Sequence, residues 1–326
     1  MSTGTPEHQR HLIADIGGTH ARFALCTSAA DIQKVDMLNS ADFPTLPDAI
    51  HHYLDSHGKP TVRHAVIGIA NPVLGDHIRM TNFPWEFSIE ETRRSLGLDT
   101  LHVINDFTAL ALALPHLPKE ELTRVGGDDG VPGCPMGVLG PGTGLGVSAL
   151  VPAPTGKWIP LAAEGGHVSF APADDRERML WQAARREFGH VSNERLLSGS
   201  GLQFIHRTLC ASRGLAAPEH TPADISRRAL KEGDASCLEA LDIFCAILGT
   251  AAGDLALTLG ARSGIYIGGG IVPKLGDYFP GSPFRARFED KGRFSAYLAA
   301  IPVFVINSAY PALLGAAAHL DTYPNE

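Results

Sequence analysis

Short apolar runs that end in glycine, asparagine or proline alternate with longer helix-like runs along most of this chain. Short runs bounded by turn formers are typical of buried strands, and longer periodic runs are typical of helices. The alternation favours an α/β architecture. In the first third of the chain it predicts strands over residues 12–16, 21–26, 65–70 and 102–104, and a helix over residues 107–114.

A second strand–glycine–strand pattern begins near residue 137, in "MGVLGPGTGLGVSALV", with Thr143 inside the turn. It echoes the opening stretch "LIADIGGTHARFAL", and duplicated units in two domains would produce such an echo. A further predicted strand, residues 265–267, runs directly into three glycines.

Two later helices carry cap signals. Thr221 precedes a proline and an acidic first turn, which predicts a helix start. Ser236 followed by Glu239 has the capping-box spacing and predicts the start of a long apolar helix. That helix carries Asp242 and Asp254, and its uncharged run is too short for a bilayer span of roughly 20 residues, so we expect a buried helix.

Composition limits the class of protein. A chain of 326 residues suggests about two domains. The formal charge of −8 argues against nucleic acid and against an anionic membrane as partners. Five cysteines without a CxxC pair indicate reduced thiols in a reducing compartment rather than zinc or disulfides. The polar start MSTGTPEHQR lacks the apolar core of a secretory signal.

Glycine turns can hold phosphates because several backbone N–H groups approach an anion where Cβ atoms are missing. The turns here do not match a Walker P-loop or a Rossmann fingerprint, both of which open a helix. A single Gly-Gly hairpin is usually structural, but three such turns at strand ends suggest nucleotide binding. Asp15 is either a turn former or a group that orients the water shell of Mg²⁺, and Thr19 is either a turn hydroxyl or a phosphate donor.

The motifs "DIGGTHARFAL", "GPGTGLGV" and "IGGGIVP" resemble the two phosphate segments and the adenosine segment of the hexokinase–actin-like ATPase superfamily. Within it, "MTNFPWEFS", "VINDFTALA", "EGGHVSFAP", "ERLLSGSGL" and "FEDKGRF" resemble the bacterial glucokinase family, in order, from about Leu12 to His319. No cysteine-rich zinc motif follows EGGH, so the resemblance is to the zinc-free glucokinases. The chain departs from the family at His20, where asparagine is common, and the role of His20 stays open.

The resemblance implies two actin-like, ribonuclease-H-like α/β domains flanking a deep cleft. We expect a small domain over residues 1–115, to which residues 306–326 return, and a large domain over residues 116–305. It further implies ATP:glucose 6-phosphotransferase activity with Mg²⁺, in a cytoplasmic homodimer. The residues it assigns to the nucleotide are Asp15 (to Mg²⁺ through water), Gly17, Gly18, Thr19, Gly142, Thr143, Gly144, Gly268, Gly269 and Gly270.

The resemblance assigns Asp106 as the base that accepts the proton of the sugar 6-hydroxyl, with Asn105 beside it. A carboxylate is a weak base for an alcohol, but orientation matters more than basicity in a loose phosphoryl-transfer transition state. The structural alternative is a helix N-cap pair. The family also places Glu164, His167 and Glu194 on the sugar, and such acceptors and donors suit hydroxyl groups.

Other positions stay open. Asn82 and Trp85 either line the sugar side of the cleft or belong to the core, and the charges of "FEDKGRF" have no role that the sequence predicts. A non-catalytic sugar-sensing regulator is the alternative class, but it needs a DNA-binding module. Only eleven residues precede the first predicted strand, so we expect no such module. The spacing of motifs does not distinguish glucose from other hexoses, or ATP from another phosphoryl donor.

Overall fold

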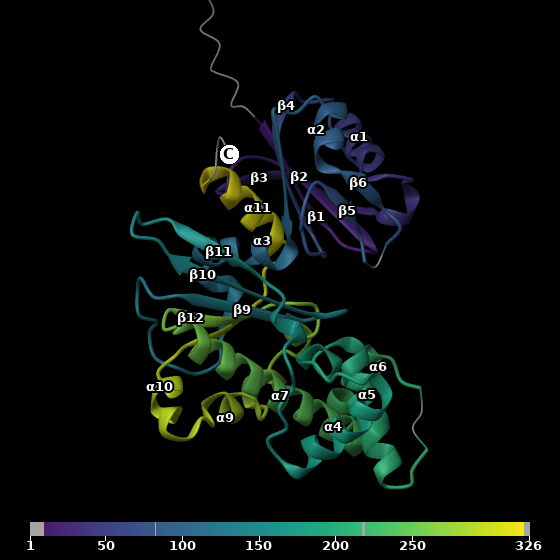
Figure 1. The fold of residues 1–326 in the computed structure, drawn as a ribbon, viewed down its shortest axis with the longest axis vertical. Coiled ribbons are helices and arrows are strands. Elements are labelled where there is room, and N and C mark those ends of the chain that lie inside the picture. The colour runs from purple at the N-terminus through teal and green to yellow at the C-terminus, as the bar shows by residue number, and fades with distance from the viewer. Residues whose placement is uncertain (1–9, 82, 217–218, 323–326) are drawn as a thin grey trace, which may run out of the picture. The chain divides into compact units, whose positions relative to one another are not determined.

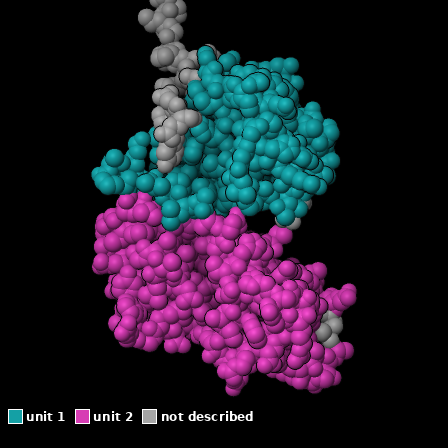
Figure 2. All heavy atoms as spheres, viewed as in Figure 1, with its two compact units in different colours: residues 1–118, 153–162, 308–326 teal, residues 119–152, 163–307 magenta. Residues whose placement is uncertain are grey.

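The computed structural model describes residues 10–81, 83–216 and 219–322. The chain divides into two compact units (Figure 2): unit 1 comprises residues 1–118, 153–162 and 308–326, and unit 2 comprises residues 119–152 and 163–307. The sequence-based division differs mainly at residues 153–162, which it gave to the large domain. This segment contacts the C-terminal helix of unit 1, where the Lys157 ammonium donates to the Thr322 carbonyl at 3.1 Å.

Unit 1 is built on a five-stranded sheet with the order β3-β2-β1-β4-β7. β1 is antiparallel to β2 and parallel to β4, which is parallel to β7. All four predicted strands and the predicted helix of this region are confirmed, with bounds that differ by up to three residues. The strands are β1 (Arg10–Ile16), β2 (His20–Ser28), β3 (Asp31–Asn39), β4 (Val62–Ile69) and β7 (Thr100–Asn105), and a small hairpin joins β5 (His77–Arg79) to β6 (Glu86–Ser88).

The two faces of this sheet are covered by different helices because side chains alternate along each strand. Leu12, Ala14 and Ile16 of β1 belong to the core that contains α1 (Leu46–Ser56). Ile13 points the other way, into the cluster that contains residues of α11 (Pro311–Thr322). In Figure 1 α11 lies beside α3 (Asp106–Ala113), and the two helices contact each other along their length. A short helix, α2 (Ile89–Ser95), precedes β7.

The second large sheet has the order β11-β10-β9-β12-β13-β8, and every strand of it except β11 lies wholly within unit 2. Its second glycine hairpin and the strand before the three glycines are both confirmed. The strands are β8 (Leu122–Arg124), β9 (Met136–Pro141), β10 (Leu145–Pro152), β11 (Trp158–Ala163), β12 (Gly264–Ile267) and β13 (Val303–Ile306). The helices are α4 (Asp175–Phe188), α5 (Gly199–Ser212), α6 (Pro222–Arg227), α7 (Ala235–Leu259), α8 (Tyr278–Gly281), α9 (Phe284–Glu289) and α10 (Ser295–Ala299).

The long helix α7 is the core helix of unit 2, and it packs against β9 and β12 (Figure 1). Within the described residues it is long and apolar enough to cross a bilayer, but 67% of its most apolar window is buried. The expectation of a buried helix is therefore confirmed. The predicted capping box is wrong, because Asp234 is the N-cap and accepts hydrogen bonds from the Ser236 and Cys237 amides at 3.0 and 3.2 Å.

The predicted start of α6 is confirmed. Thr221 caps the helix, and the Asp224 carboxylate accepts a reciprocal bond from the Thr221 amide, which makes a full capping box. This reciprocal pair satisfies two backbone donors at the helix end.

The "FEDKGRF" segment joins α9 to α7. Phe288 is fully buried, and the Lys291 ammonium lies 2.7 Å from the Asp254 carboxylate of α7. Gly253 allows this close approach, since a Cβ there would lie 2.7 Å from the Phe288 carbonyl oxygen. The segment thus holds two helices of unit 2 together, which is a structural role that its charges alone do not predict.

The sequence echo corresponds to a repeated sheet. The order β3-β2-β1-β4-β7 in the first sheet matches β11-β10-β9-β12-β13 in the second. In both sheets a glycine hairpin links two antiparallel strands, and two further strands lie parallel to the first strand of the hairpin. The glycine turn after β1 therefore has its counterpart after β9, and the segment after β4 has its counterpart after β12.

Candidate active site

Several predicted site residues of unit 1 lie at the carboxyl edge of its sheet. Ile16 of β1 pairs in register with Ile69 of β4, which pairs with Asn105 of β7. The glycine turn, the Asn71 turn and Asp106 each follow one of these three strands. Because the three strands are parallel, their ends meet at one edge, which is where α/β folds place their ligands.

The hairpin turn after β1 is closed by its own backbone. The Gly17 amide donates to the His20 carbonyl at 2.9 Å, and Ser40 binds the Thr19 and Gly17 carbonyls through its amide and hydroxyl. Thr19 and His20 are exposed. A Cβ at Gly17 would lie 3.4 Å from the His20 oxygen, which is an ordinary contact, so the packing of the chain does not require glycine here. Glycine is also the residue that lets a ligand approach the backbone closely.

Asp15 is paired across the hairpin with Arg22, a residue that the sequence analysis did not single out. The guanidinium nitrogen lies 3.1 Å from Asp15 Oδ2, and the two residues are register neighbours. Burial raises the pKa of the Asp15 carboxyl, and the charge and hydrogen bond of Arg22 oppose that rise. Arg22 thus favours the ionised form of Asp15.

Asp15 and the start of α3 lie on the same face of the sheet. Asp15 is the register neighbour of Gly68 on β4. A Cβ at Gly68 would point at α3, 3.5 Å from the Ala109 Cβ and 3.8 Å from the Asp106 Cα. Adjacent in-register residues of parallel strands point to the same side. The structure therefore brings the Asp15 and Asp106 segments together.

Asn105 caps α3, as the structural alternative predicted. Its Oδ1 accepts hydrogen bonds from the Phe107 and Thr108 amides at 2.9 and 3.2 Å, and its Nδ2 donates to the Asn71 carbonyl at 3.4 Å. Asp106 is the first residue of the helix, and its Oδ1 also accepts from the Phe107 amide. A helix N-terminus favours a carboxylate through its exposed amides and its dipole. The cap fixes the direction of Asn105 without using all of its amide hydrogens.

Asn71 lies in the turn after β4 and is a further site candidate. Its Oδ1 accepts hydrogen bonds from the amide and hydroxyl of Thr81 at 3.0 and 2.5 Å. Asn82 lies outside the described residues. Trp85 belongs to the core: it is 3% exposed, and its indole N–H donates to the Phe43 carbonyl at 3.1 Å.

The two glycine turns of unit 2 lie side by side, at the ends of the parallel strands β9 and β12. A Cβ at Gly140 would lie 2.5 Å from the Gly268 carbonyl carbon, and the Gly268 amide donates to the Leu139 carbonyl at 2.9 Å. Gly269 has a φ of +78°, and its missing Cβ would meet the Pro141 oxygen at 2.4 Å. These two glycines are required by close packing. Gly270 has open space around its Cβ position.

Helix α5 begins at the same place. The turn over residues 142–144 is closed by a bond from the Gly142 amide to the Gly144 carbonyl at 2.8 Å, and the Gly199 amide donates to the Gly142 carbonyl at 2.9 Å. Gly199 is the first residue of the 14-residue helix α5, which Ser198 caps. The positive end of a helix beside a glycine turn is a site that suits phosphate groups.

Glu164, His167 and Glu194 form one cluster in unit 2. His167 Nε2 lies 3.9 Å from Glu164 Oε2, and His167 Nδ1 lies 3.9 Å from Glu194 Oε1. Glu164 directly precedes the short turn over residues 165–167, which ends at His167, and Glu194 lies in the turn over residues 193–195. A bond from the Asn193 amide to the Val168 carbonyl at 3.0 Å joins the two segments. All three side chains are partly exposed, so they present acceptors and donors to solvent.

The glycines of EGGH let this cluster sit directly on β10. A Cβ at Gly166 would lie 2.1 Å from the Leu145 carbonyl oxygen, and a Cβ at Gly165 would lie 2.8 Å from the Val147 side chain. Any side chain at Gly166 would push the turn away from the strand, because the obstacle is backbone. The two glycines therefore have a packing reason, and the flanking Glu164 and His167 are the groups left for chemistry.

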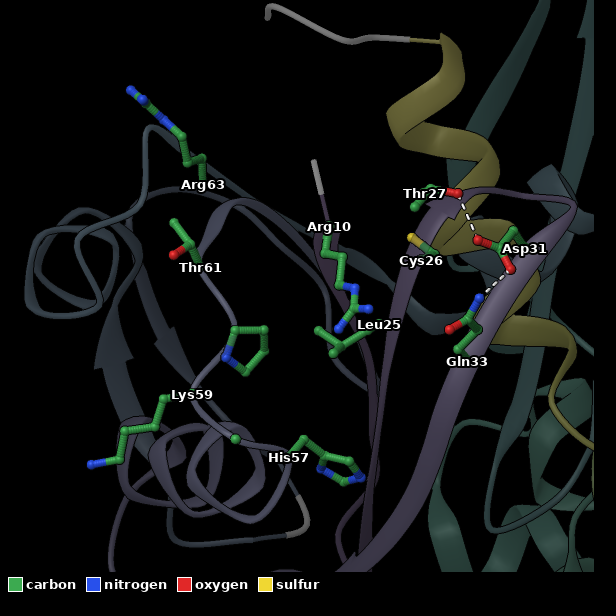
Figure 3. A pocket seen from close by; sticks show the side chains of 12 residues that line it. Arg10, Leu25, Cys26, Thr27, Asp31, Gln33, His57, Lys59, Thr61 and Arg63 are labelled. Atoms are coloured by element: carbon green, nitrogen blue, oxygen red, sulfur yellow. Dashed lines mark hydrogen bonds between the residues drawn. The ribbon is translucent and has the colours of Figure 1, made fainter. Parts of the chain in front are cut away.

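Unit 1 also contains a cavity of about 790 Å³ at the opposite edge of its sheet, beside the starts of β1 and β4 (Figure 3). Its one acid, Asp31, accepts hydrogen bonds from Thr27 and Gln33 at 2.7 and 2.6 Å. Lys59 and Arg63 point away from the cavity in Figure 3 and pair with carboxylates outside it. It contains none of the predicted site residues, and we assign it no role.

Comparison of the fold with solved structures identifies the class of protein as sugar kinases of the actin-like fold. The structure matches a ROK-family glucokinase from Streptomyces griseus, solved with glucose and AMPPNP, with a TM-score of 0.63 at 20% identity over 94% of this chain and 98% of that chain. This likeness shows the fold, which is the actin-like fold of sugar kinases.

A nearer structure is that of a glucokinase from an Antarctic psychrotroph, with a TM-score of 0.87 and 37% identity over 96% of this chain and 99% of that chain. A glucokinase of Chromobacterium violaceum is 61% identical over 98% of this chain and 92% of its own length. The family model described as glucokinase matches residues 12–323. The chain belongs to the glucokinase family.

Proposed function

We propose that this protein transfers the γ-phosphoryl group of ATP to the 6-hydroxyl of glucose, giving glucose 6-phosphate and ADP. The observation that supports this most is the position of Asp106 at the capped start of α3, in a chain 61% identical to a glucokinase. The Asp106 carboxylate accepts a hydrogen bond from the Phe107 amide there, and orientation is what a loose phosphoryl-transfer transition state requires of its base.

In this proposal Asp106 accepts a hydrogen bond from the sugar 6-hydroxyl and takes its proton as the oxygen attacks the γ-phosphorus. The bond from oxygen to γ-phosphorus forms while the bond from γ-phosphorus to the β-bridging oxygen breaks, and ADP leaves. Asn105 donates an amide hydrogen to a neighbouring sugar hydroxyl. Its capping bonds to α3 hold the amide in the direction that this contact needs.

Unit 2 contributes groups of two kinds to this reaction. Glu164, His167 and Glu194 bind further sugar hydroxyls, since carboxylates accept and an imidazole both donates and accepts. The turns formed by Gly142, Thr143 and Gly144 and by Gly268, Gly269 and Gly270 bind nucleotide phosphates through backbone amides, helped by the N-terminus of α5. In unit 1, Gly17, Gly18 and Thr19 bind phosphate in the same way.

The residues present fit Mg²⁺. This ion takes few protein carboxylates and keeps several waters. The described residues contain no group of three or more metal-ligating side chains. Asp15 and Asp106 lie on the same face of the unit 1 sheet, at its carboxyl edge. Asp15 would hold the ion through water, with Oδ1, because Oδ2 is paired with Arg22. When bound, Mg²⁺ neutralises charge on the phosphate oxygens.

We further propose that the protein acts in the cytoplasm as a homodimer, with the two compact units as the two domains of the kinase. All five cysteines are free thiols, which supports a reducing compartment. Sedimentation velocity on the purified protein tests the proposed dimer. We expect a species of about twice the chain mass of 34.7 kDa. A species of single-chain mass across micromolar concentrations would refute it.

The test of the function is a steady-state assay of the purified protein with a panel of sugars and phosphoryl donors. Each assay follows release of ADP or phosphate together with the sugar phosphate. We expect the highest kcat/KM with glucose and ATP, and loss of turnover when Mg²⁺ is chelated. A higher kcat/KM with another hexose or with polyphosphate would replace the assigned substrate, and binding of glucose without turnover would favour a sugar sensor.

A further inference from the structure

We propose that Glu194 links the sugar-binding cluster to the phosphate-binding turn, so that glucose and nucleotide bind cooperatively through this side chain. The inference rests on the proposed function, because it uses the ligands assigned there. It concerns unit 2 alone.

The two carboxylate oxygens of Glu194 contact different parts of the site. Glu194 Oε2 accepts a hydrogen bond from the Leu145 amide at 2.9 Å, and Leu145 directly follows the turn over residues 142–144. Glu194 Oε1 lies 3.9 Å from His167 Nδ1, in the cluster that binds sugar hydroxyls. The side chain is 32% exposed, so it reaches solvent while one oxygen is tied to the turn.

Gly144 makes this contact possible. A Cβ at Gly144 would lie 2.4 Å from Glu194 Oε2, closer than real Cβ atoms come to other atoms. The φ of Gly144 lies outside the left-handed region, so its backbone does not itself require glycine. The same turn contains Gly142, where a Cβ would lie 3.8 Å from the Gly270 amide, an ordinary contact. The space at Gly144 is therefore occupied by the Glu194 carboxylate.

A second bond ties the same two segments together. The Gly199 amide donates to the Gly142 carbonyl at 2.9 Å, five residues after Glu194 in the chain. The turn is thus held at both of its ends by the segment that carries Glu194 and opens α5. A phosphate group that orders the turn also orders Glu194, and the sugar then meets a carboxylate already in place. By linkage, bound glucose must favour the nucleotide to the same degree.

The experiment is isothermal titration calorimetry of glucose with and without AMPPNP and Mg²⁺, on the full chain. We expect bound nucleotide to lower the glucose dissociation constant of the wild-type protein roughly fivefold or more, the usual size of coupling between two binding sites. In Gly144→Ala, glucose binding without nucleotide weakens by about tenfold, because the new methyl group displaces the carboxylate from its place. In the same variant the ratio of the two dissociation constants falls below about twofold.

Gly281→Ala is the matched control, since it adds the same methyl group to unit 2 at the end of α8, where the Cβ position has nothing within 4 Å. Its glucose affinity in the absence of nucleotide stays within about twofold of wild type. Wild-type coupling retained in Gly144→Ala would overturn the inference, as would a wild-type protein that binds glucose equally with and without nucleotide. A wild-type protein that binds no glucose would instead overturn the proposed function.

If Gly144→Ala lacks the unfolding transition of the wild type, Glu194→Gln and Glu194→Ala replace it. Glutamine keeps a side-chain carbonyl that can accept from the Leu145 amide, so it retains coupling at lower glucose affinity. Alanine has no acceptor, so coupling is lost. Equal coupling in the two variants would overturn the inference.

Discussion

The Asn105 side chain performs two tasks through different atoms, and two substitutions separate them. Oδ1 caps α3 by accepting from the Phe107 and Thr108 amides at 2.9 and 3.2 Å. Nδ2 is the donor that we assign to a sugar hydroxyl. Serine is as good an N-cap as asparagine but has no amide hydrogens, whereas alanine can neither cap nor donate. Asn105→Ser therefore removes one task, and Asn105→Ala removes both.

The expected magnitudes differ between the two tasks. Loss of an N-cap costs about 1 kcal/mol, which lowers the melting temperature of a unit of roughly 150 residues by about 2–4 °C. Loss of one hydrogen bond to a neutral hydroxyl costs about 1 kcal/mol of transition-state binding, which is roughly fivefold in kcat/KM. We expect Asn105→Ser to lower kcat/KM without lowering the melting temperature. We expect Asn105→Ala to lower kcat/KM by the same factor and to lower the melting temperature as well.

Calorimetric melting and a coupled assay with varied glucose measure both effects on the same preparations. The weak bond from Nδ2 to the Asn71 carbonyl, at 3.4 Å, is lost equally in both variants and cancels in their comparison. A serine variant with wild-type kcat/KM would refute the sugar contact. Serine and alanine variants with equal melting temperatures would refute the assignment of Asn105 as the cap that matters for stability.

Three further predictions concern charged groups. Asp106→Asn lowers kcat by roughly 10²-fold or more, with little change in the glucose dissociation constant. Rapid-quench kinetics measures the first quantity and calorimetry the second. An unchanged kcat would show that Asp106 is not the base. Arg287 lies 2.8 Å from Oε1 of Glu177, which is 1% exposed, although not at a hydrogen-bonding angle. Arg287→Met should cost about 3–5 kcal/mol in urea unfolding, and adding Glu177→Gln should recover part of it; an unchanged midpoint would contradict this. Burial lowers the pKa of His319 from 6.5 to about 4, so the unfolded chain binds more protons in that range. Stability should therefore fall as pH falls from 6.5 toward 4, less steeply in His319→Gln, and equal pH slopes would show that His319 is not responsible.

The sequence predicts those features that depend on neighbours along the chain. The two strands that flank the Gly17 turn are confirmed. They were predictable because each is a short apolar run bounded by turn-forming residues. Asn105 and Asp106 were placed correctly at a strand end followed by a helix, and this local order determines their position at the carboxyl edge. The start of α6 follows from residues within one helical turn.

Features that depend on register or on distant segments were not predicted. The pairing of Asp15 with Arg22 requires the hairpin register, and the bond from Glu194 to the Leu145 amide joins residues 49 positions apart. The edge strand β3 lacks the buried alternation of a half-covered strand, since none of its residues is buried. At α7, Asp234 and Ser236 both suit an N-cap, and the helix uses the earlier residue.

The reaction assigned to this chain is phosphorylation of the 6-hydroxyl of glucose with ATP. The most direct test is phosphorus NMR of a reaction that contains the purified protein, glucose, ATP and Mg²⁺. We predict that the γ-phosphate resonance of ATP disappears as the resonances of ADP and of one phosphomonoester appear, and that the ester matches glucose 6-phosphate. A phosphate ester at another position, ADP and inorganic phosphate without any ester, or an unchanged ATP spectrum would contradict this assignment.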